Sequence, residues 1–229
     1  MQEAIQGYGI RSRFQIIPNV VDTHLFRSDP TPNMKSPVKR LLVVSLLDSN
    51  HKKGIPYLLH ALARVRSKRD DWYLDIVGDG PARIEYERLV EELGLAEKVI
   101  FHGIRSKREV AEFMRKADLF VSPSLVETFS VVVAEALATG IPVLTTRSGG
   151  PEEFVTDNVG MLIPPGSVEA LYTGLNYMLD NLPLYSHYFI SQYASKLFSP
   201  ERVGMSLHTI YQSLKSRDQR KGSDNGGKV

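Results

Sequence analysis

The most informative stretch of this chain reads Asp118-Leu-Phe-Val-Ser-Pro-Ser-Leu-Val-Glu127-Thr-Phe-Ser-Val-Val-Val-Ala-Glu135. It begins with an apolar run typical of a buried strand, continues through a loop that presents Glu127, and passes into a helical pattern that carries Glu135. Open α/β sheets bind their ligands at the carboxyl ends of such strands. The stretch therefore predicts a parallel sheet with a ligand site at this strand end.

The start of the predicted helix is also a predicted anion site. If the helix begins at Thr128, the backbone N–H groups of Thr128–Val131 have no acceptor within the helix, and the helix dipole favours negative charge beside them. A carboxylate next to an anion site suits a ligand that also carries hydroxyl groups. A nucleotide-sugar offers both, with a diphosphate for the amides and hydroxyls for Glu127 and Glu135. The alternative is that both glutamates are ordinary solvated residues.

Apolar runs alternate with helical patterns along most of the chain, which predicts an α/β fold with a Rossmann-like doubly wound parallel sheet, followed by C-terminal helices. One of these helices is capped by Ser167 and another opens at Ser199-Pro200. The predicted strands are Arg13–Pro18, Arg40–Leu46, Trp72–Val77, Lys98–Gly103, Asp118–Ser122, Pro142–Thr145 and Gly160–Ile163.

The same patterns predict four segments. Residues 1–36 form a linker segment with the first strand, and residues 37–198 form the Rossmann-like domain, which would bind the nucleotide-sugar. Residues 199–215 form a C-terminal helix. Residues 216–229 are polar and rich in Gly, Ser and Lys, which is typical of a disordered tail.

Composition narrows the class of protein. The chain has 229 residues, a hydrophobic fraction of 42% and a net charge of +2, which is too small to indicate a nucleic-acid partner. It has no cysteine, so a disulfide, a thiolate metal site and a cysteine nucleophile are all excluded. No apolar run approaches the length of a transmembrane segment, and we expect a cytoplasmic protein.

Four further motifs follow predicted strands. Lys53-Gly54 opens a helix, where the ammonium group can meet a phosphate as a point charge, although a solvated lysine pair is the alternative. Gly78-Asp-Gly-Pro81 permits a tight turn or a close ligand approach. Phe101–Arg105 and Ser148–Glu153 follow two other strands. Because parallel strands end at one sheet edge, all of these loops are expected to lie together.

Together the motifs resemble the C-terminal, donor-binding domain of retaining GT-B glycosyltransferases of family 4, over nearly the whole chain. Glu127 to Glu135 is similar to that family's E-x7-E motif, and Gly149–Glu153 to its Gly-Gly segment. The other segments that follow the family's order are Arg13–Phe26, Lys53-Gly54, Gly78–Pro81, Phe101–Ile104, Ala117-Asp118, Pro164–Gly166 and Phe198–Glu201.

The resemblance implies a role for each matching residue. Glu127 would contact the hydroxyls of the donor sugar and Lys53 would neutralise the departing diphosphate, so these two residues are the expected catalytic groups. The amides of Thr128, Phe129 and Ser130 would hold the distal phosphate, Glu135 the ribose, and the backbone near Ile104 and Arg105 the base. Ser45, His51 and Gly78 complete the expected donor site. The family uses neither a metal nor a cofactor, and this sequence has no Asp-x-Asp metal motif.

Three departures qualify these expectations. Ser45-Leu46-Leu47 stands where the family often has Gly-Arg-Leu, so His51 or Lys52 would have to replace the missing arginine. Thr128 and Ser130 stand where glycines are common. The N-terminal acceptor domain of the family is absent from this sequence, so we expect either such a domain as a partner or self-association of the chain. A peripheral contact with a membrane is compatible with this expectation.

Two other readings of the sequence are possible. A truncated, non-catalytic module that binds a nucleotide or a nucleotide-sugar is the alternative function. An unrelated Rossmann enzyme such as a dehydrogenase lacks the expected Gly-x-Gly-x-x-Gly after the first strand.

Overall fold

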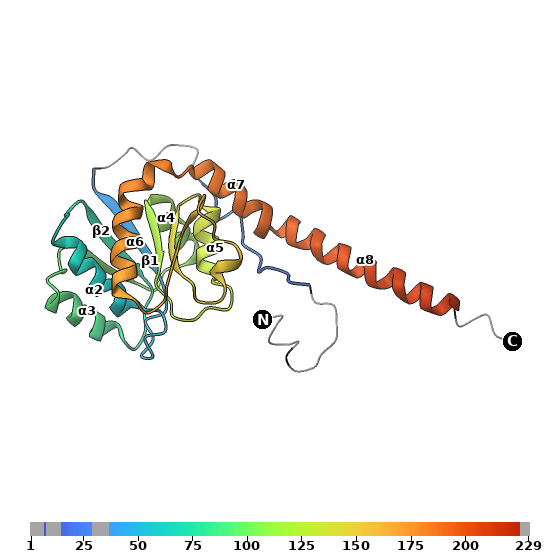
Figure 1. Ribbon diagram of the computed structural model, residues 1–229, viewed down its shortest axis with the longest axis horizontal. Helices are drawn as coiled ribbons and strands as arrows, with labels where there is room; N and C mark the ends of the chain where they lie inside the picture. The colour runs from blue at the N-terminus through green and yellow to red at the C-terminus, as the bar shows by residue number, and fades with distance from the viewer. Residues whose placement is uncertain (1–6, 8–14, 29–36, 225–229) are drawn as a thin grey trace.

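Six parallel strands form one sheet in the order β3-β2-β1-β4-β5-β6 (Figure 1). This computed structural model describes residue 7, residues 15–28 and residues 37–224, with side chains described as far as residue 215. The sheet confirms the predicted doubly wound fold. Its strands are β1 (Lys39–Val44), β2 (Trp72–Val77), β3 (Val99–Gly103), β4 (Leu119–Ser122), β5 (Val143–Thr146) and β6 (Gly160–Ile163).

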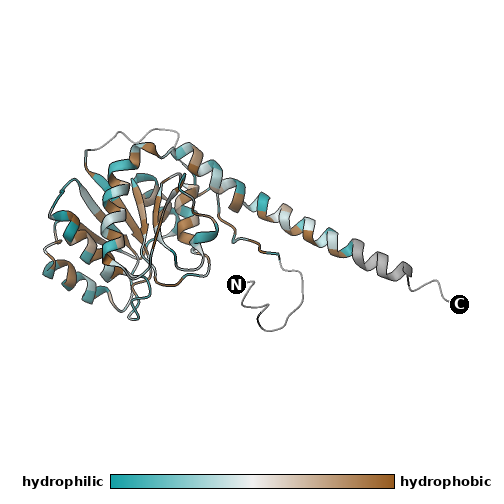
Figure 2. Ribbon diagram, in the orientation of Figure 1, coloured by the Kyte–Doolittle hydropathy of each residue, from teal (hydrophilic) through white to brown (hydrophobic). Residues whose placement is uncertain are grey.

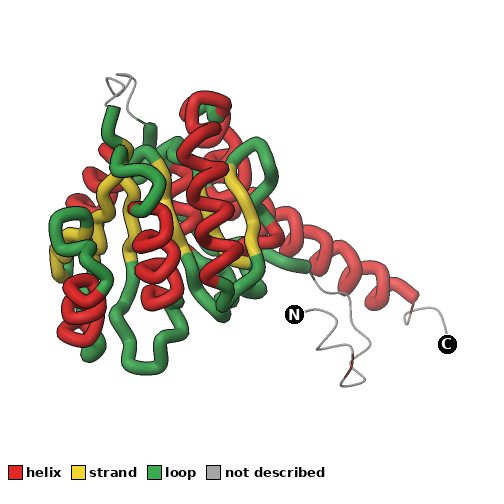
Figure 3. The backbone as a smooth tube through the Cα atoms, turned by 60° about the vertical axis from the view of Figure 1, so that its left-hand side comes forward, coloured by secondary structure: helices red, strands yellow, loops and turns green. Residues whose placement is uncertain are grey.

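Helices cover both faces of the sheet (Figure 3). Successive side chains of a strand point to opposite faces, so Leu41 and Val43 pack in one core and Leu42 packs in the other. The first core includes residues of α2 (Ile55–Arg66), α3 (Arg83–Glu92) and α6 (Val168–Asn181). The second includes residues of α4 (Lys107–Lys116), α5 (Val131–Ala138) and α7 (His187–Phe198).

The strand order reverses beside β1, which positions the site. β1 pairs with β2 on one side and with β4 on the other. The loop after β1 leads to α2 on one face, whereas the loop after β4 leads to α5 on the opposite face. Such a switch point leaves a crevice outside the carboxyl ends of the two strands.

The predicted strand Arg13–Pro18 is wrong in its described part, because residues 15–18 have no strand structure. This segment joins the domain farther along the chain, where Val21 and Phe26 are buried and the Val21 N–H donates to the Phe198 carbonyl at 2.9 Å. Its packing against the C-terminal helices takes the place of strand pairing. Residues 13 and 14 lie outside the described part of the chain.

The C-terminal region is more helical than predicted. Helix α7 was not predicted, although Ser186 caps it and the buried residues Ile190, Ala194 and Phe198 recur every four positions. Helix α8 spans Pro200–Asp224, so it extends well beyond the predicted end at residue 215. Its Lys, Arg and Gln residues have good helix propensity, which the polar composition concealed. The last five residues of the predicted tail, 225–229, lie outside the described residues.

Helix α8 extends away from the sheet, and Figure 2 shows hydrophobic residues along its described part. Val203, in its first turn, is buried, whereas Leu207, Tyr211 and Leu214 are 36%, 67% and 50% exposed. Within the described residues, no helix combines the length and the apolar character needed to cross a membrane.

Candidate functional site

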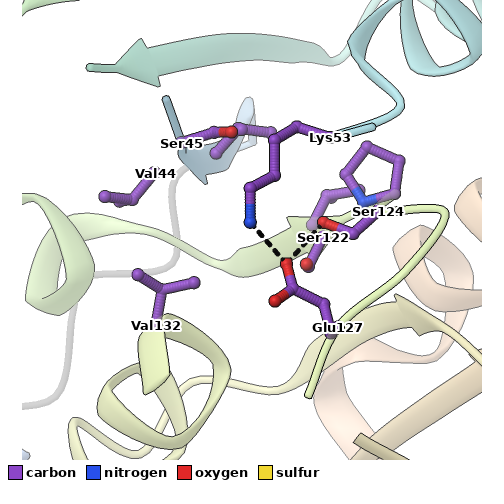
Figure 4. A pocket seen from close by; sticks show the side chains of 10 residues that line it. Val44, Ser45, Lys53, Ser122, Ser124, Glu127 and Val132 are labelled. Carbon is purple, nitrogen blue, oxygen red and sulfur yellow. Dashed lines mark hydrogen bonds and ion pairs between the residues drawn. The ribbon is translucent and has the colours of Figure 1, made fainter. Parts of the chain in front are cut away.

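A small pocket lies between the loops that follow β1 and β4, at the switch point of the sheet (Figure 4). The end of β1, the end of β4, the two loops and the start of α5 all contribute to its lining. The lining residues are Val43, Val44, Ser45, Lys53, Val121, Ser122, Pro123, Ser124, Glu127 and Val132.

Lys53 and Glu127 meet in this pocket, although 74 positions separate them in the chain. The Lys53 Nζ atom lies 2.7 Å from the Glu127 Oε1 atom, and the Ser124 hydroxyl donates to the same oxygen at 2.8 Å (Figure 4). The Glu127 side chain is 13% exposed and the Lys53 side chain 33% exposed. The predicted catalytic pair is therefore an ion pair at the pocket wall.

Two glycines bring the loops together. Gly54 has a φ of +68°, and a Cβ atom there would lie 1.9 Å from the Pro123 carbonyl oxygen. A Cβ atom on Gly150 would lie 2.5 Å from the Cα atom of Phe129. The Glu127 N–H also donates to the Ser148 carbonyl at 2.8 Å. The loop that carries Glu127 thus rests directly on the backbone of the loop after β5.

Helix α5 begins at Val131, not at Thr128 as predicted. Ser130 causes the difference, because its left-handed φ of 67° is incompatible with a right-handed helix. Within the described residues, the backbone N–H groups of residues 128–132 have no hydrogen-bond acceptor. The predicted anion site therefore becomes a turn followed by a helix start, with five free amides.

Phe129 anchors this turn through its side chain. Its ring centroid lies 5.2 Å from that of Phe154 and 5.6 Å from that of Phe198, with the latter pair in an edge-on arrangement. Such aromatic pairs stabilise beyond the area that they bury. The Phe129 backbone amide is thus held in place by packing against the end of α7.

Glu135 lies on α5 and is 9% exposed, without a hydrogen-bond partner among the described residues. Burial raises the pKa of its carboxyl group to about 7, and the positive charge of Lys107 opposes this effect only in part. Glu135 does not line the pocket but lies one helical turn beyond Val132, which does. A buried carboxylate with free oxygens is suited to accept hydrogen bonds from hydroxyl groups.

His51 does not accompany Lys53 in the pocket. Its Nδ1 atom lies 2.9 Å from the Tyr86 hydroxyl and its Nε2 atom 3.5 Å from a Glu85 oxygen, so both ring nitrogens face α3. Lys52 is exposed. In this conformation, neither side chain is held beside Lys53 as a replacement for the arginine that the family often has.

The remaining predicted residues surround the pocket. Ser45 lines it, whereas Gly78 packs against the Ser45 carbonyl, which a Cβ atom on residue 78 would approach to 1.8 Å. This glycine therefore serves a contact within the protein. Ile104 is 78% exposed on the loop after β3, and Arg105 is exposed beside it. Thr128 is exposed on the amide turn.

Sequence reasoning missed Ser124, which is 3% exposed and contacts Glu127 directly. The spacing Ser-x-x-Glu resembles a capping box, but no helix begins at Ser124 and its hydroxyl bonds the Glu127 side chain itself, so local sequence did not indicate this contact. Among the described residues, no group of three or more His, Cys, Asp or Glu side chains could hold a metal ion. Independence from metals stays a prediction.

Comparisons with known proteins find similar sequences and structures over most of the chain. Residues 31–194 match the family described as Glycosyl transferases group 1. The chain is 31% identical over 186 residues to the GDP-mannose-dependent α-(1-6)-phosphatidylinositol monomannoside mannosyltransferase of Mycolicibacterium smegmatis, covering 76% of this chain and 49% of that protein. Of the first three curated relatives, the chain spans about half the length or less.

Solved structures of similar fold include two examples of higher sequence identity. The C-terminal domain of a glycosyl transferase group 1 family protein, LpcC of Francisella tularensis, is 27% identical with a TM-score of 0.64, covering 77% of this chain and 95% of that one. Anabaena HepE in complex with UDP and glucose is 26% identical with a TM-score of 0.76, covering 94% of this chain and 60% of that one.

Ser130→Gly is expected to stabilise the protein. Glycine removes a left-handed backbone cost of about 1–2 kcal/mol, and it also removes the Ser130 hydroxyl, which is buried without a partner. The greater freedom of glycine in the unfolded chain offsets roughly 1 kcal/mol of this gain. We expect a melting temperature a few degrees higher in thermal unfolding.

Ser106→Gly is the matched control, because Ser106 starts α4 with an ordinary φ of −65° and a formed capping box. It should lower the melting temperature slightly. A fall of similar size for Ser130→Gly would contradict the cost assigned to its backbone.

Glu135→Gln is expected to change how stability depends on pH. The folded-state pKa of Glu135 is about 7 against an ordinary 4.5, so the folded protein holds this proton more tightly than the unfolded chain. The stability that protonated Glu135 contributes is therefore fully present below the unfolded pKa and is lost as pH rises through the folded pKa. Glutamine stays neutral, so Glu135→Gln should gain stability over the wild type by roughly 1–3 kcal/mol between pH 5 and pH 8.

Urea unfolding at both pH values measures this difference. Glu112→Gln, which neutralises an exposed glutamate on α4, should show no comparable gain. Equal gains for the two variants would contradict the role of burial at Glu135.

Proposed function

The chain belongs to the glycosyl transferases group 1 family, and from this premise we propose that it is the donor-binding domain of a retaining, metal-independent hexosyltransferase. The observation that carries the proposal is the Lys53–Glu127 ion pair beside the turn of free amides at residues 128–132. An ammonium group and backbone amides suit a diphosphate, and a neighbouring carboxylate suits sugar hydroxyls. A nucleotide-sugar unites these groups in one molecule.

Each part of the ligand has a place in this proposal. The amides of Thr128, Phe129 and Ser130 hold the distal phosphate, and Lys53 approaches the same phosphate from the opposite loop. Glu127 accepts hydrogen bonds from the donor sugar and Glu135 from the ribose. The exposed loop at Ile104 and Arg105 contacts the base.

The chemistry follows from where charge develops. The bond between the anomeric carbon and the distal phosphate oxygen breaks, and the acceptor oxygen forms the new bond to that carbon. The acceptor proton passes to the departing phosphate. Lys53 and the fixed amides stabilise the negative charge that builds on this phosphate, which lowers the barrier without a metal ion. The similar proteins include a relative named for GDP-mannose and a structure in complex with UDP and glucose, so the binding test includes both nucleotides.

A second domain is part of the proposal, because the chain spans about half or less of the length of the first three curated relatives. Leu207, Ile210 and Leu214 lie on one face of α8 at spacings of three and four residues. That face continues from the buried Val203 onto the exposed part of the helix. We propose that it packs on an acceptor-binding domain, or on a second copy of the chain when that domain is lacking. A cytoplasmic location stays an expectation from the sequence.

Nucleotide binding tests the donor site. The chain should bind a nucleoside diphosphate and its nucleotide-sugar, with Glu135→Ala weakening both by about 1.5–3 kcal/mol, because it loses hydrogen bonds to a charged group. Glu127→Ala should weaken the nucleotide-sugar more than the bare nucleotide. Calorimetric titration with UDP, GDP, ADP and their sugar derivatives measures these constants.

Glu112→Ala, on the exposed side of α4, is the control and should leave both affinities unchanged. Absence of binding by the wild type at millimolar concentrations of every ligand would refute the proposed function. Equal losses for both ligands in both site variants would refute the separate roles of Glu127 and Glu135.

Self-association of the chain through α8, or its binding to an acceptor domain, tests the proposal of a second domain. The pure chain should transfer no sugar unaided and should self-associate or bind an acceptor-domain polypeptide, because its apolar face is exposed. Replacing Leu207 and Leu214 with serine should abolish this association in light scattering. Met205→Ser changes a residue off that face and should not. A strictly monomeric chain that transfers sugar by itself would contradict the proposal.

A further inference from the structure

Ser124 occupies a position in the site that none of the roles above uses. Its hydroxyl donates to the Glu127 Oε1 atom at 2.8 Å, and the Lys53 Nζ atom contacts that same oxygen at 2.7 Å (Figure 4). Among the described residues, no group donates to the other oxygen, Oε2. One carboxylate oxygen is therefore held from two sides, and the second is left for a ligand.

Ser124 is itself firmly held. It is 3% exposed, and its carbonyl oxygen accepts a hydrogen bond from the hydroxyl of Thr146, which is fully buried in β5. The next residue, Leu125, donates its N–H to the Lys52 carbonyl at 2.7 Å. These contacts tie Ser124 both to the sheet and to the loop that carries Lys53. Its hydroxyl is thus a hydrogen-bond donor held in a fixed position beside Glu127.

Lys53 is expected to hold Glu127 less firmly when a diphosphate is bound than in the empty site. In the empty site its ammonium group is paired with Glu127, but the proposed function gives the same ammonium group a diphosphate to neutralise. A diphosphate carries more negative charge than one carboxylate, so it draws Lys53 toward itself. The ion pair then weakens at the moment when Glu127 has to face the donor sugar.

We propose that Ser124 is a positioning residue that keeps Glu127 in place when Lys53 turns to the diphosphate. The inference rests on the proposed function of the site. Ser124 holds Oε1 through a hydrogen bond that the phosphate does not compete for, and this orients Oε2 toward a hydroxyl of the sugar. Recognition of the sugar therefore depends on Ser124, whereas recognition of the nucleoside diphosphate does not.

The test compares two affinities in each protein. For the nucleotide-sugar that binds the wild type, and for its nucleoside diphosphate, calorimetry gives the ratio of the two dissociation constants. Ser124→Ala should weaken the nucleotide-sugar by about threefold to tenfold, the range expected for one hydrogen bond, and should leave the nucleoside diphosphate nearly unchanged. Lys53→Ala should weaken both ligands.

Ser191→Ala is the matched control, because Ser191 is also buried and donates to a backbone carbonyl, that of Ala138, at 2.8 Å. It should leave the ratio unchanged, which separates a loss of positioning from a general loss of stability. Ser124→Thr restores a hydroxyl and should restore the ratio. If Ser124→Ala does not fold, Ser124→Cys gives the same comparison with a weaker donor.

The outcomes separate the two proposals. A wild type that binds neither ligand refutes the proposed function. A wild type that binds both, with a ratio unchanged in Ser124→Ala or in its cysteine substitute, overturns the role of Ser124 and leaves the proposed function standing. A ratio that changes equally in Ser191→Ala also overturns it.

Discussion

The contact between Gly54 and the Pro123 carbonyl is the constraint on which the site depends. No side chain fits between these two backbones, because even a single Cβ atom would lie 1.9 Å from the carbonyl oxygen. The contact joins the loop after β1 to the end of β4, and Lys53 is the residue that precedes it. The ammonium group of Lys53 can therefore reach Glu127 across the switch point of the sheet. Gly150 does the same for the opposite wall, where it supports the backbone of Phe129.

Several energetically unfavourable features lie on the segment from residue 128 to residue 135. Ser130 adopts a left-handed backbone and buries a hydroxyl without a partner, and Glu135 holds a carboxylate in a poorly solvated position. Five backbone amides beside them have no acceptor within the described part of the protein. Each feature costs free energy in the empty protein. A ligand with a diphosphate and several hydroxyl groups would satisfy the amides and the carboxylate, and the rest of the fold supplies the stability that keeps the turn in place.

The second core, on the α5 face of the sheet, holds the amide turn in place. The amide turn is anchored by Phe129, whose ring packs against Phe154 and Phe198. Phe198 closes α7 and its carbonyl accepts a hydrogen bond from Val21, so the turn is linked to both the C-terminal helices and the segment at residues 15–28. Helix α8 continues from this region with its apolar face exposed. A partner on α8 would thus bind close to elements that support the donor site.

The sequence by itself determined the sheet and most of its helices, because the alternation of apolar strands with helical periodicity repeats along the chain. It also indicated Lys53, Glu127 and Glu135 as candidate site residues, since each follows a strand that ends at the same sheet edge. Helix α7 and the full length of α8 were predictable in principle from capping residues and helix propensity. No local pattern shows that residues 13–18 were wrongly predicted as a strand, because the conformation of the segment depends on helices far along the chain.

Only the tertiary structure decided how these residues combine. The orientation of His51 toward Tyr86, the shared contact of Lys53 and Ser124 with one oxygen of Glu127, and the burial of Glu135 all join residues distant in the sequence or depend on how closely the chain packs around them. The start of α5 depends on one dihedral angle at Ser130, the residue after Phe129, whose backbone lies against Gly150 of the loop after β5. Local patterns specify the elements, whereas side-chain pairing and backbone strain arise only when the packed elements meet.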